Sequence, residues 1–460
     1  MFRVSELLKA TGGRLINQGD TLNTKGISID SRTIQPQEVF LAIKGSNFDG
    51  HDFITEAIKK GATCIIKEAA SRKLLPRAGR QAKEVVFIEV KDTTKALGDI
   101  ACFQRKKSFA VPVIAVTGSN GKTTTKEMIA HLLAKKFKVL KNEGTKNNQI
   151  GLPLALLKLN NSYDAAVLEI GTNHFGEVGY LTRICLPNIG IITNIGPSHL
   201  EYLHNLAGVF REKYSLIENL EKPYIAILNA DDDLLRRKVF ARVGKSITLS
   251  FGVKHKSDFS ASHIRNISGK LEFRIHKKYR FTLKTLGYYN IYNALAAIAV
   301  SRLFGIAYSD LALRLATFDF PQGRLKFVKI NQINFIDDTY NSNPLSFNLA
   351  LEVLNNFKST GRKVFVMGDM LELGSQQDKL HCRAGRLAAG CCDIFITVGK
   401  LSRLAAKEAK AVHFDTKNIF TCATTAQARD ILFRRISLTK DDTVMVKGSR
   451  LMKMEEVFRI

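Results

Sequence analysis

The stretch "VIAVTGSNGKTTTKEM", Val113–Met128, joins a run of apolar residues to a run of helix formers through two glycines. Val113–Val116 predicts a buried strand and residues 125–136 predict a helix. A glycine loop between a strand and a helix gathers backbone N–H groups and the positive end of the helix dipole at one point, which suits a phosphate.

The usual phosphate-loop pattern G-x-x-x-x-G-K-[ST] has its first glycine at the position of Val116. The alternatives are therefore a shorter phosphate loop and an ordinary helix start with a surface lysine. The run G-x-x-G-K-T-T directly after an apolar strand favours the phosphate loop.

The composition indicates a soluble globular protein with reduced cysteines. The chain has 460 residues, 45% of them hydrophobic and 24% charged, and this length suffices for two to four domains. Its seven cysteines are scattered without a C-x-x-C pair, which favours free thiols over disulfides or a zinc site. No apolar run reaches the roughly 18 residues of a membrane span, and the N-terminal segment lacks the apolar core of a signal peptide. We therefore expect a cytoplasmic protein without a membrane span.

The formal net charge of +27 is the unusual feature of the composition. A nucleic-acid partner, an anionic small-molecule substrate and a generally basic proteome would each account for it. Lysine and arginine are spread along the whole chain, with only local clumps such as "QRKKS". This distribution favours a solvated basic surface. A P-loop NTPase that binds nucleic acid remains an alternative of a different functional class.

The alternation of apolar strands with helices predicts an α/β protein of three domains. Residues 1–107 mix short strands with helices and predict a mixed α/β domain. Residues 108–318 alternate nearly continuous apolar strands with helices, which indicates a parallel sheet covered on both faces, the P-loop domain. The pattern restarts after "FDFPQGR", so residues 319–460 predict a Rossmann-like domain with a smaller parallel sheet.

Side chains suited to a nucleotide and a metal ion lie in the loop and after the next strands. Lys122 would reach the β- and γ-phosphates, and Thr123 or Thr124 would place a hydroxyl on Mg²⁺. Glu169 ends an apolar strand, where a metal carboxylate is expected, although Asp is the usual acid there. His199 follows a strand end and Lys213 lies on the next predicted helix. For these two residues, spacing alone is also explained by a structural histidine and a solvated lysine.

The chain resembles the Mur ligase family over nearly its whole length. The resemblance rests on "SIDSRTIQPQEVFLAIKGSNFDGHDF", "TGSNGKTTTKE", "EIGTNHFGE", "NIGPSHLEYL", "GYYNIYNALAA", "GRLKF", "IDDTYNSNP" and "MGDMLELG". The short loop is similar to the family's own G-[ST]-x-G-K-[ST]-[ST], which accounts for Val116. "GTNHFGE", "DDTYNSNP" and "GDMLELG" are typical of the members that add D-alanyl-D-alanine to UDP-N-acetylmuramoyl-tripeptide. They separate these members from siblings that add L-alanine, D-glutamate or the third residue, and from folylpolyglutamate synthases.

This resemblance implies an ATP site with two Mg²⁺ ions. The phosphate loop would consist of Thr117, Gly118, Ser119, Asn120, Gly121, Lys122, Thr123 and Thr124. Glu169 would hold one Mg²⁺ together with Thr123, and His199 would hold the second. Lys213 matches a lysine that is carbamylated in the family, and a carbamate offers a hard metal the oxygen ligand that an ammonium does not.

The resemblance also assigns residues to the rest of the nucleotide. Asn290 and Asn293 match adenine contacts, with capping of a helix start as the alternative. Arg324 would reach the phosphates from the third domain. Asp338 would bind the ribose, with Tyr340 near the base. Because Arg324 and Asp338 lie on a different domain from Lys122, we expect the third domain to close onto the second.

Two further segments match positions that contact the muramoyl-peptide nucleotide. Ser31, Arg32, Asp49, Gly50 and His51 fall in segments that hold the uridine diphosphate, although "NFDGHD" is also good turn chemistry. Asn147, Asn148 and Gly151 remain in the central loop "NEGTKNNQIG", where the muramoyl-peptide is expected. In that loop Thr145 replaces the usual asparagine and Gln149 the usual histidine, and Ile170 stands where methionine is commoner. These departures concern substrate contacts and leave the ATP chemistry unaffected.

The implied reaction is the activation of a carboxylate for peptide-bond formation. The terminal carboxylate of the tripeptide attacks the γ-phosphate of ATP and gives an acyl phosphate and ADP. Two Mg²⁺ ions, Lys122 and Arg324 offset the charge on the transferring phosphoryl group. The amine of D-alanyl-D-alanine then displaces phosphate. We expect a monomer that binds no nucleic acid. A sibling Mur or folylpolyglutamate-type ligase with another substrate and a non-catalytic relative remain as alternatives.

Overall fold

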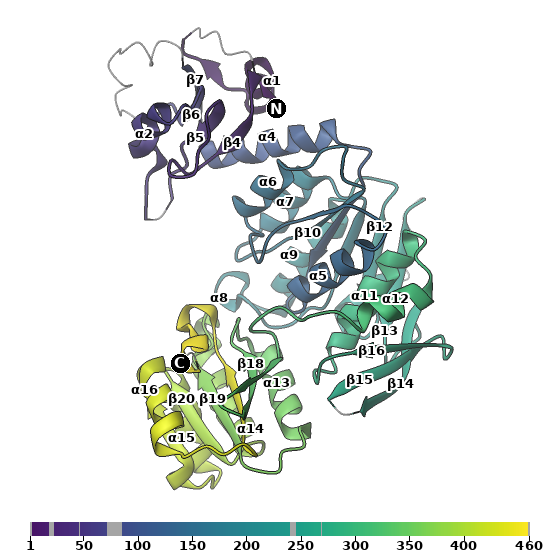
Figure 1. Cartoon of the computed structure of the whole chain (residues 1–460), viewed down its shortest axis with the longest axis vertical. Coiled ribbons are helices and arrows are strands. Elements are labelled where there is room, and N and C mark those ends of the chain that lie inside the picture. The colour runs from purple at the N-terminus through teal and green to yellow at the C-terminus, as the bar shows by residue number, and fades with distance from the viewer. Residues whose placement is uncertain are drawn as a thin grey trace. The chain divides into compact units, whose positions relative to one another are not determined.

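Helices and strands alternate along the chain, as the sequence predicts for an α/β protein (Figure 1). The structure is a computed structural model that describes residues 2–17, 23–45, 47–70, 85–239, 245–267 and 269–458. Two units form: unit 1 is Met1–Val113, Lys138–Gly171 and Gly179–Pro187, and unit 2 is Ile114–Phe137, Thr172–Val178 and Asn188–Ile460. Within the described ranges, no helix has the length and apolar character to cross a membrane.

Unit 1 contains a five-stranded sheet in the order β2-β7-β6-β5-β4. Strands β4 (Gly26–Ser28), β5 (Glu38–Leu41), β6 (Cys64–Glu68) and β7 (Val86–Val90) are parallel, and β2 (Arg14–Leu15) is antiparallel. Around it lie β1 (Phe2–Arg3), β3 (Asn23–Thr24), α1 (Val4–Thr11), η1 (Gly50–Phe53), α2 (Ile54–Lys59) and α4 (Thr93–Lys107). Helix α1 is followed by Gly12, whose φ of 62° gives the left-handed cap that glycine favours.

A second part of unit 1 carries the central loop that the sequence singles out. Strands β9 (Val139–Lys141) and β10 (Ala165–Glu169) pair in parallel. Helix α6 (Gly151–Leu156) lies between them in the sequence, and α7 (Glu177–Cys185) follows β10. All five residues of β10 are buried, so Glu169 ends an otherwise apolar strand inside the protein.

The first sheet of unit 2 carries the phosphate loop. Its strands follow the order β16-β15-β14-β13-β12-β11-β8. They are β8 (Val113–Thr117), β11 (Ile189–Ile192), β12 (Ile225–Asn229), β13 (Ile247–Gly252), β14 (Phe259–Ile267), β15 (Lys270–Ile275) and β16 (Tyr279–Leu283). Its helices are α5 (Lys122–Leu133), α8 (Leu200–Leu203), α9 (Leu206–Glu218), α10 (Asp233–Val239), α11 (Asn290–Leu303) and α12 (Tyr308–Leu315). Helix α11 packs against α5.

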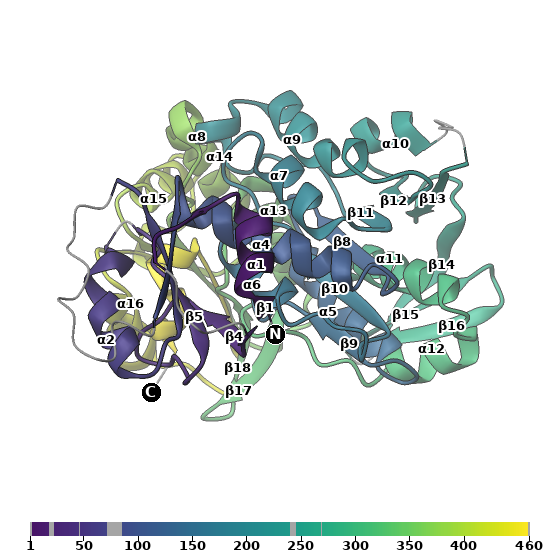
Figure 2. The same ribbon diagram turned by 90° about the horizontal axis from the view of Figure 1, so that it is seen from above.

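The second sheet of unit 2 has the order β17-β18-β22-β19-β20-β21. Strands β18 (Ile333–Asp338), β22 (Thr443–Lys447), β19 (Lys363–Gly368), β20 (Ile394–Val398) and β21 (Ile419–Cys422) are parallel, and β17 (Lys326–Ile330) is an antiparallel edge. The helices are α13 (Pro344–Asn356), α14 (Gln377–Ala389), α15 (Ser402–Ala411) and α16 (Thr425–Asp430) (Figure 2).

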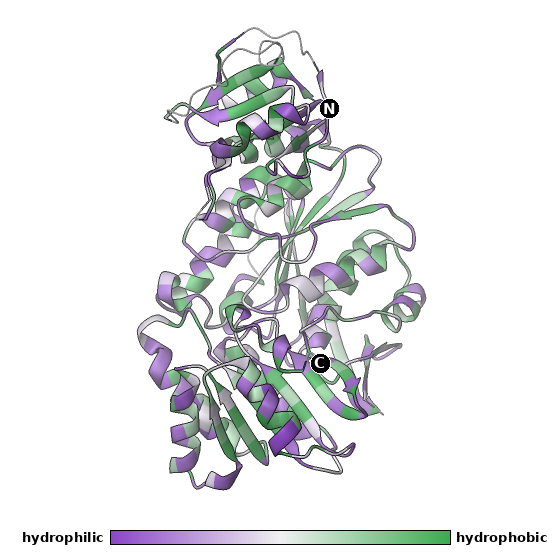
Figure 3. Ribbon diagram, turned by 60° about the vertical axis from the view of Figure 1, so that its left-hand side comes forward, coloured by the Kyte–Doolittle hydropathy of each residue, from purple (hydrophilic) through white to green (hydrophobic). Residues whose placement is uncertain are grey.

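Successive side chains of β19 point to opposite faces of the sheet, and each face is covered by a different set of helices. Phe365 and Met367 pack with α13, α14 and α15, whereas Val364 and Val366 pack with α16 and the C-terminal turns. The strands are accordingly coloured as mostly hydrophobic in Figure 3, while the helices carry both colours. Near-continuous apolar strands between two layers of helices are what the sequence predicts for this region.

The α/β fold class with mainly parallel sheets is confirmed, and two details differ from expectation. The helix predicted over residues 125–136 spans Lys122–Leu133, because it starts directly after Gly121. The antiparallel strands β14–β16 were not expected; buried and exposed residues alternate along them, so they lack the long apolar runs of the parallel strands. The domain boundaries after residues 107 and 318 stay a prediction.

The buried Arg105 offers a test of what holds unit 1 together. Its guanidinium donates to the carbonyls of Cys185 (3.0 Å), Ser108 (2.8 Å) and Leu186 (3.2 Å). Arg105→Ala leaves these acceptors without that donor, and we expect it to lower the free energy of unfolding by about 3 kcal/mol or more. Urea unfolding followed by circular dichroism measures the change.

Arg14→Ala is the matched control in the same unit. Arg14 pairs with Glu89 at 2.9 Å, but its side chain is 78% exposed. An exposed pair contributes less than about 1 kcal/mol, so the control should unfold nearly as the unchanged chain does. Equal losses for the two variants would contradict the assignment of Arg105 as an internal tie.

Candidate functional site

The phosphate loop is held by the end of the neighbouring strand β11. The backbone N–H of Ser119 donates to the Asn194 carbonyl, and that of Asn120 donates to Asn194 Oδ1, both at 3.0 Å. The Asn120 carbonyl accepts hydrogen bonds from Thr193 Oγ1 (2.6 Å) and Asn194 Nδ2 (3.0 Å). Ser119 Oγ also bonds the backbone of Gly196. The loop is therefore fixed in shape by its own unit before any ligand is considered.

Two glycines give this loop its path. Gly118 and Gly121 have φ values of 144° and 84°, which L-residues with side chains rarely adopt. A Cβ on Gly118 would collide with Thr193 Oγ1, and one on Gly121 would collide with Asn293 Oδ1. Backbone conformation and close packing thus both require glycine at these positions.

Three basic side chains of unit 2 gather near the loop. Lys122 Nζ folds back to the carbonyls of Gly118 (2.8 Å) and Ser119 (3.4 Å). Lys213 on α9 is 1% exposed, and burial lowers the pKa of its amine well below the usual value, with the Lys122 charge lowering it further. Burial also lowers the pKa of His199, against the hydrogen bond from Nδ1 to Glu372 Oε2 at 2.7 Å.

Residues of the second sheet of unit 2 contact the loop directly. Arg324 Nη2 donates to Thr123 Oγ1 at 2.9 Å, and its guanidinium stacks over the Tyr340 ring at 4.0 Å from the centroid. Asn343 Nδ2 donates to Asn120 Oδ1 at 2.9 Å. The motifs "GRLKF" and "DDTYNSNP" are thereby brought to the phosphate loop, while the predicted contacts of Arg324 with the phosphates and of Tyr340 with the base stay a prediction.

Asp338 lies at the end of β18, and each of its two carboxylate oxygens has a hydrogen-bond partner within the protein. Its Oδ2 pairs with Lys447 Nζ at 2.6 Å, and its Oδ1 accepts the backbone N–H of Leu325 at 3.2 Å. Burial raises the pKa of this carboxyl, while the Lys447 ammonium opposes the rise. Its carboxylate therefore anchors the segment that carries Arg324.

Asn290 and Asn293 lie in a buried chain of hydrogen bonds at the start of α11. Asn290 Nδ2 donates to Thr285 Oγ1 (3.1 Å), and Asn293 Nδ2 donates to Asn290 Oδ1 (2.9 Å). Thr125 Oγ1 in turn donates to Asn293 Oδ1 (3.2 Å). The two amides thus connect α11 to α5 and to the loop glycine Gly121, so their predicted adenine contacts stay a prediction.

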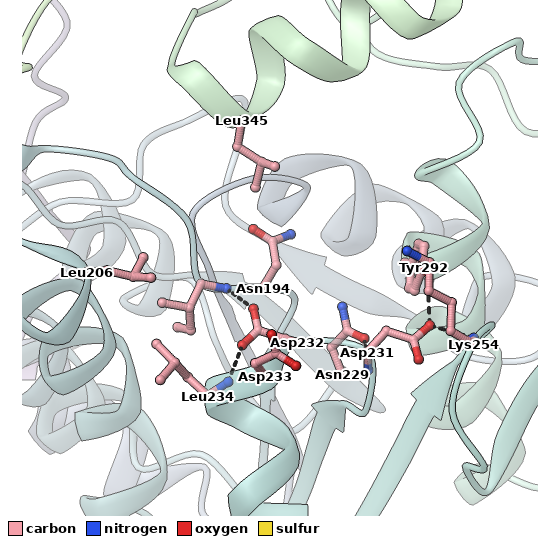
Figure 4. Close-up of a pocket in the computed structure, with 11 residues that line it drawn as sticks. Asn194, Leu206, Asn229, Asp231, Asp232, Asp233, Leu234, Lys254, Tyr292 and Leu345 are labelled. Carbon is pink, nitrogen blue, oxygen red and sulfur yellow. Dashed lines mark hydrogen bonds between the residues drawn. The ribbon is translucent and has the colours of Figure 1, made fainter. Parts of the chain in front are cut away.

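A cavity of about 310 Å³ opens beside the phosphate loop (Figure 4). It is lined by Asn194, Ile195, Leu206, Asn229, Asp231, Asp232, Asp233, Leu234, Lys254, Tyr292 and Leu345. Asp231 accepts the Tyr292 hydroxyl at 2.9 Å, and Asp232 accepts the backbone N–H of Ile195 at 2.6 Å. These aspartates disfavour a phosphate in the cavity itself, so it suits an uncharged part of a ligand.

In unit 1, Glu169 is held by the central loop. Its Oε1 accepts the Asn147 amide at 2.7 Å, and its backbone bonds the buried Asn142. Asn148 Oδ1 accepts the N–H groups of Ile150 and Gly151 and so caps α6. Asn147 and Asn148, predicted as substrate contacts, therefore also shape the loop. Thr145 and Gln149 lie in the same loop, and Ile170 follows Glu169 in the buried interior.

The predicted uridine-diphosphate residues lie in two turns of unit 1. Ser31 Oγ donates to Glu56 at 3.0 Å, and Arg32 pairs with Asp30 while its side chain stays 83% exposed. His51 is buried: Nδ1 bonds Asp49 Oδ1 (2.6 Å) and Nε2 accepts the N–H of Glu68 (3.0 Å). Gly50 approaches the Ile43 backbone too closely for a Cβ. The "NFDGHD" turn is thus present, and Arg32, in the other turn, is the exposed basic side chain that could meet an anion.

No group of three or more His, Cys, Asp or Glu side chains suited to a metal lies within the described ranges. The residues present nevertheless fit the implied Mg²⁺ ions by their chemistry. Thr123 and Glu169 offer oxygen donors, and the buried, readily neutral amine of Lys213 is the form that a carbamate requires.

Three models of one family match successive parts of the chain. They are the Mur ligase family catalytic domain (residues 23–105), the Mur ligase middle domain (116–301) and the Mur ligase glutamate ligase domain (323–450). The chain is 34% identical over 468 residues to the UDP-N-acetylmuramoyl-tripeptide--D-alanyl-D-alanine ligase of Escherichia coli, covering 99% of this chain and 97% of that one. The chain belongs to the Mur ligase family.

Solved structures of Mur ligases agree in fold. A crystal structure of MurF from Acinetobacter baumannii matches with a TM-score of 0.87 at 30% identity, covering 99% of this chain and 97% of that one. A MurF ligase from Thermotoga maritima, in complex with ADP, matches with a TM-score of 0.81 at 28% identity, covering 94% and 96%. The three-domain α/β fold class predicted from the alternation of strands and helices is that of these Mur ligases.

Sequence reasoning missed several residues of this Mur ligase site. Asn194 and Asn343 bond the phosphate loop, Lys447 pairs with Asp338, and Glu372 bonds His199. Glu212, beside Lys213, accepts the N–H groups of Gly176 and Val178 and so holds the "GTNHFGE" segment. The available signal was their place inside or next to the motif strings, but contacts between distant segments are not readable from one sequence.

Gly121→Ala tests whether the loop path matters for nucleotide binding. The added Cβ meets Asn293 Oδ1 and sits on a left-handed φ, so we expect the affinity for ADP to fall at least about tenfold, from roughly 1–3 kcal/mol of strain. Titration calorimetry with ADP measures this. Gly305→Ala is the control, since Gly305 also has a positive φ (74°) but open space around it. An unchanged ADP affinity in Gly121→Ala, or equal losses in both variants, would contradict the role assigned to the loop.

Proposed function

We propose that the chain is an ATP-dependent ligase that joins D-alanyl-D-alanine to the terminal carboxylate of UDP-N-acetylmuramoyl-tripeptide, a step of peptidoglycan precursor synthesis. The observation that carries the proposal is the full-length likeness to the Escherichia coli ligase that bears these substrates in its name. The phosphate loop and the buried Lys213 beside it are consistent with ATP-dependent activation of a carboxylate. We propose a cytoplasmic, monomeric enzyme without a nucleic-acid partner.

Lys122 and Arg324 are the cations proposed to act on the phosphates. The substrate carboxylate attacks the γ-phosphate to give an acyl phosphate and ADP, and the amine of D-alanyl-D-alanine then displaces phosphate. Lys122 bonds neutral loop carbonyls and Arg324 bonds the Thr123 hydroxyl. Phosphate oxygens are stronger, charged acceptors, so ATP can exchange for these contacts without a change of the loop.

The adenosine is proposed to extend from the loop into the cavity beside it. Asn290, Asn293 and Tyr340 do not line this cavity, and they are proposed to lie near the base at its loop side. An uncharged base and ribose are compatible with the aspartate-rich lining, as phosphates are not. Asp338 uses one lone pair of each oxygen within the protein, and a ribose hydroxyl can donate to a remaining one. The ADP complex of the Thermotoga maritima relative supports a nucleotide site in this fold.

The metal proposal assigns Thr123, Glu169, His199 and carbamylated Lys213 to two Mg²⁺ ions. When bound, Mg²⁺ neutralises phosphate charge and orients the transferring group. The buried amine of Lys213 has a lowered pKa, which favours the neutral form that adds CO₂. Asn147 fixes the Glu169 side chain and so sets the direction of its carboxylate.

The three predicted domains receive separate tasks in this proposal. Residues 1–107 bind the uridine diphosphate through the turns of Arg32 and Asp49, residues 108–318 bind ATP, and residues 319–460 close over it. The hydrogen bonds of Arg324 with Thr123 and of Asn343 with Asn120 are the kind of contact that closure needs. Closure would keep water from the acyl phosphate.

Phosphate release with purified substrates tests the proposed reaction. We expect release only when ATP, Mg²⁺, UDP-N-acetylmuramoyl-tripeptide and D-alanyl-D-alanine are all present, with both the diaminopimelate and the lysine forms of the tripeptide tried. Lys122→Ala should lower the rate by at least about a hundredfold, because it removes a charge that acts on the transferring phosphoryl group. Mass spectrometry of the product identifies the added dipeptide.

Two other outcomes would replace the proposal. Release with D-alanine, an L-amino acid or a folate substrate in place of D-alanyl-D-alanine would make the chain a sibling ligase. ATP turnover stimulated by DNA or RNA, with binding that weakens steeply with salt, would favour a nucleic-acid-binding NTPase and an active role for the net charge of +27.

Carbamylation of Lys213 is tested by ¹³C NMR in bicarbonate-enriched buffer. We expect a carbamate signal that Lys213→Ala abolishes. Burial and the Lys122 charge lower the pKa of the Lys213 amine and so favour its neutral form, which is the form that adds CO₂. Lys126→Ala is the control, because Lys126 is equally buried but pairs with Glu127 at 3.0 Å. A signal that survives Lys213→Ala would refute the assignment.

A further inference from the structure

The segment "GDMLELG" of the second sheet meets "GPSHLEYL" of the first sheet in unit 2. Glu372 Oε2 lies 2.7 Å from His199 Nδ1, and the Glu372 carbonyl accepts the backbone N–H of Glu201 at 3.2 Å. Gly374 lies so close to Glu201 that a Cβ on it would be 3.1 Å from the Glu201 Cα. The loop after β19 is thus joined to the turn after β11 by side chain, backbone and close packing.

Both residues of the pair have an uncommon backbone conformation. His199 has a φ of 52° and Glu372 a φ of 61°, the left-handed region that residues other than glycine occupy in a few per cent of cases. Such conformations persist where surrounding contacts determine them, and they cluster at functional sites. Here each strained residue is a hydrogen-bond partner of the other, so the contact itself helps to hold both turns.

The contact also fixes which nitrogen of His199 carries the proton. An ionised carboxylate only accepts hydrogen bonds, so Nδ1 must be the donor. A glutamate carboxyl is ordinarily ionised at neutral pH. In a neutral ring, a proton on Nδ1 leaves the lone pair of Nε2 available to a metal ion. Hydrogen bonds of this kind orient metal-ligating histidines in many proteins.

We propose that Glu372 is a positioning residue for His199, which it holds in the Nδ1–H tautomer and in the orientation that presents Nε2 to the phosphate-bound metal. This inference rests on the proposed function, because that function supplies the metal. The proposal gives the segment "GDMLELG" a structural role, in addition to its use in distinguishing this branch of the family. Since Glu372 belongs to the loop after β19, the histidine is fully oriented only while this loop is docked on α8.

A neighbouring contact shows that a third motif lies at the same place. His174, from "GTNHFGE", packs its ring against Tyr202 at 4.3 Å between centroids, three residues after His199. Helix α8, which spans Leu200–Leu203, is therefore flanked by two of the motifs that distinguish this branch of the family. The motif residues without a role in ATP chemistry thus surround the His199 turn.

The first experiment measures the tautomer in the metal-free full-length protein. Histidine labelled with ¹⁵N is observed by long-range ¹H–¹⁵N correlation, and the His199 signals are assigned by their loss in His199→Ala. We expect a protonated Nδ1 in the unchanged chain and in Glu372→Gln, whose amide oxygen still accepts, and a mixture of tautomers in Glu372→Ala. A mixed or Nε2–H ring in the unchanged chain would overturn the proposal.

The second experiment measures Mn²⁺ binding in the presence of a non-hydrolysable ATP analogue, by electron paramagnetic resonance of free Mn²⁺. Glu372→Ala should weaken Mn²⁺ binding by about 10- to 100-fold, and Glu372→Gln by less. The affinity for the analogue in EDTA should stay within about twofold, because the nucleotide contacts are retained. Glu352→Gln, an exposed acid on α13, is the matched control and should behave as the unchanged chain.

A double-mutant cycle decides whether Glu372 acts through His199. Adding Glu372→Ala to His199→Ala should weaken Mn²⁺ binding no further. Equal weakening in both backgrounds, or Mn²⁺ affinity within about twofold of the unchanged chain in Glu372→Ala, would overturn the proposal. Should the alanine variant fail to fold by circular dichroism, Glu372→Met removes the acceptor and keeps the side-chain length. Neither binding experiment needs ligation, so a missing ligase reaction would refute the proposed function alone.

Discussion

The hydrogen bonds between the phosphate loop and the end of β11 are the constraint on which the rest of the site depends. Thr193 and Asn194 together fix the backbone of Ser119 and Asn120 on both sides. The same turn continues to Gly196 and His199, so one short segment sets the loop and a second functional side chain. The phosphate loop and His199 are therefore held by the same segment of unit 2.

Around this frame the site gathers basic side chains. Lys122, Lys213 and Arg324 come from three different elements of unit 2, and the lowered pKa of Lys213 shows the electrostatic cost of burying one of them near another. Neutral carbonyls and a hydroxyl serve as their partners at Lys122 and Arg324. An arrangement of this kind favours a highly charged anion over water.

Much of the fold and the local chemistry is predictable from the sequence, because both depend on short-range patterns. Apolar strands, the two loop glycines and Lys122 are recognised from spacing and residue type alone. The roles suggested for Glu169, His199 and Lys213 needed the family resemblance, since a single acid, histidine or lysine has ordinary structural explanations. Asn194, Asn343 and Glu372 were missed because their meaning lies in contacts across dozens to hundreds of residues. The antiparallel strands β14–β16 were missed because alternating polarity is a weaker signal than a continuous apolar run.

Asn343 performs two tasks with one short side chain. Its Oδ1 accepts the N–H of Ser346 and caps α13, while its Nδ2 bonds Asn120 in the phosphate loop. Serine, threonine or aspartate would cap the helix as well, but none of them offers an amide donor to Asn120. Substitutions of Asn343 are therefore constrained in two ways: through the stability of α13 and through the contact with the phosphate loop. A substitution that leaves stability intact can still be lost to selection, and sequence tolerance measured by thermal melting alone would overestimate how freely this residue evolves.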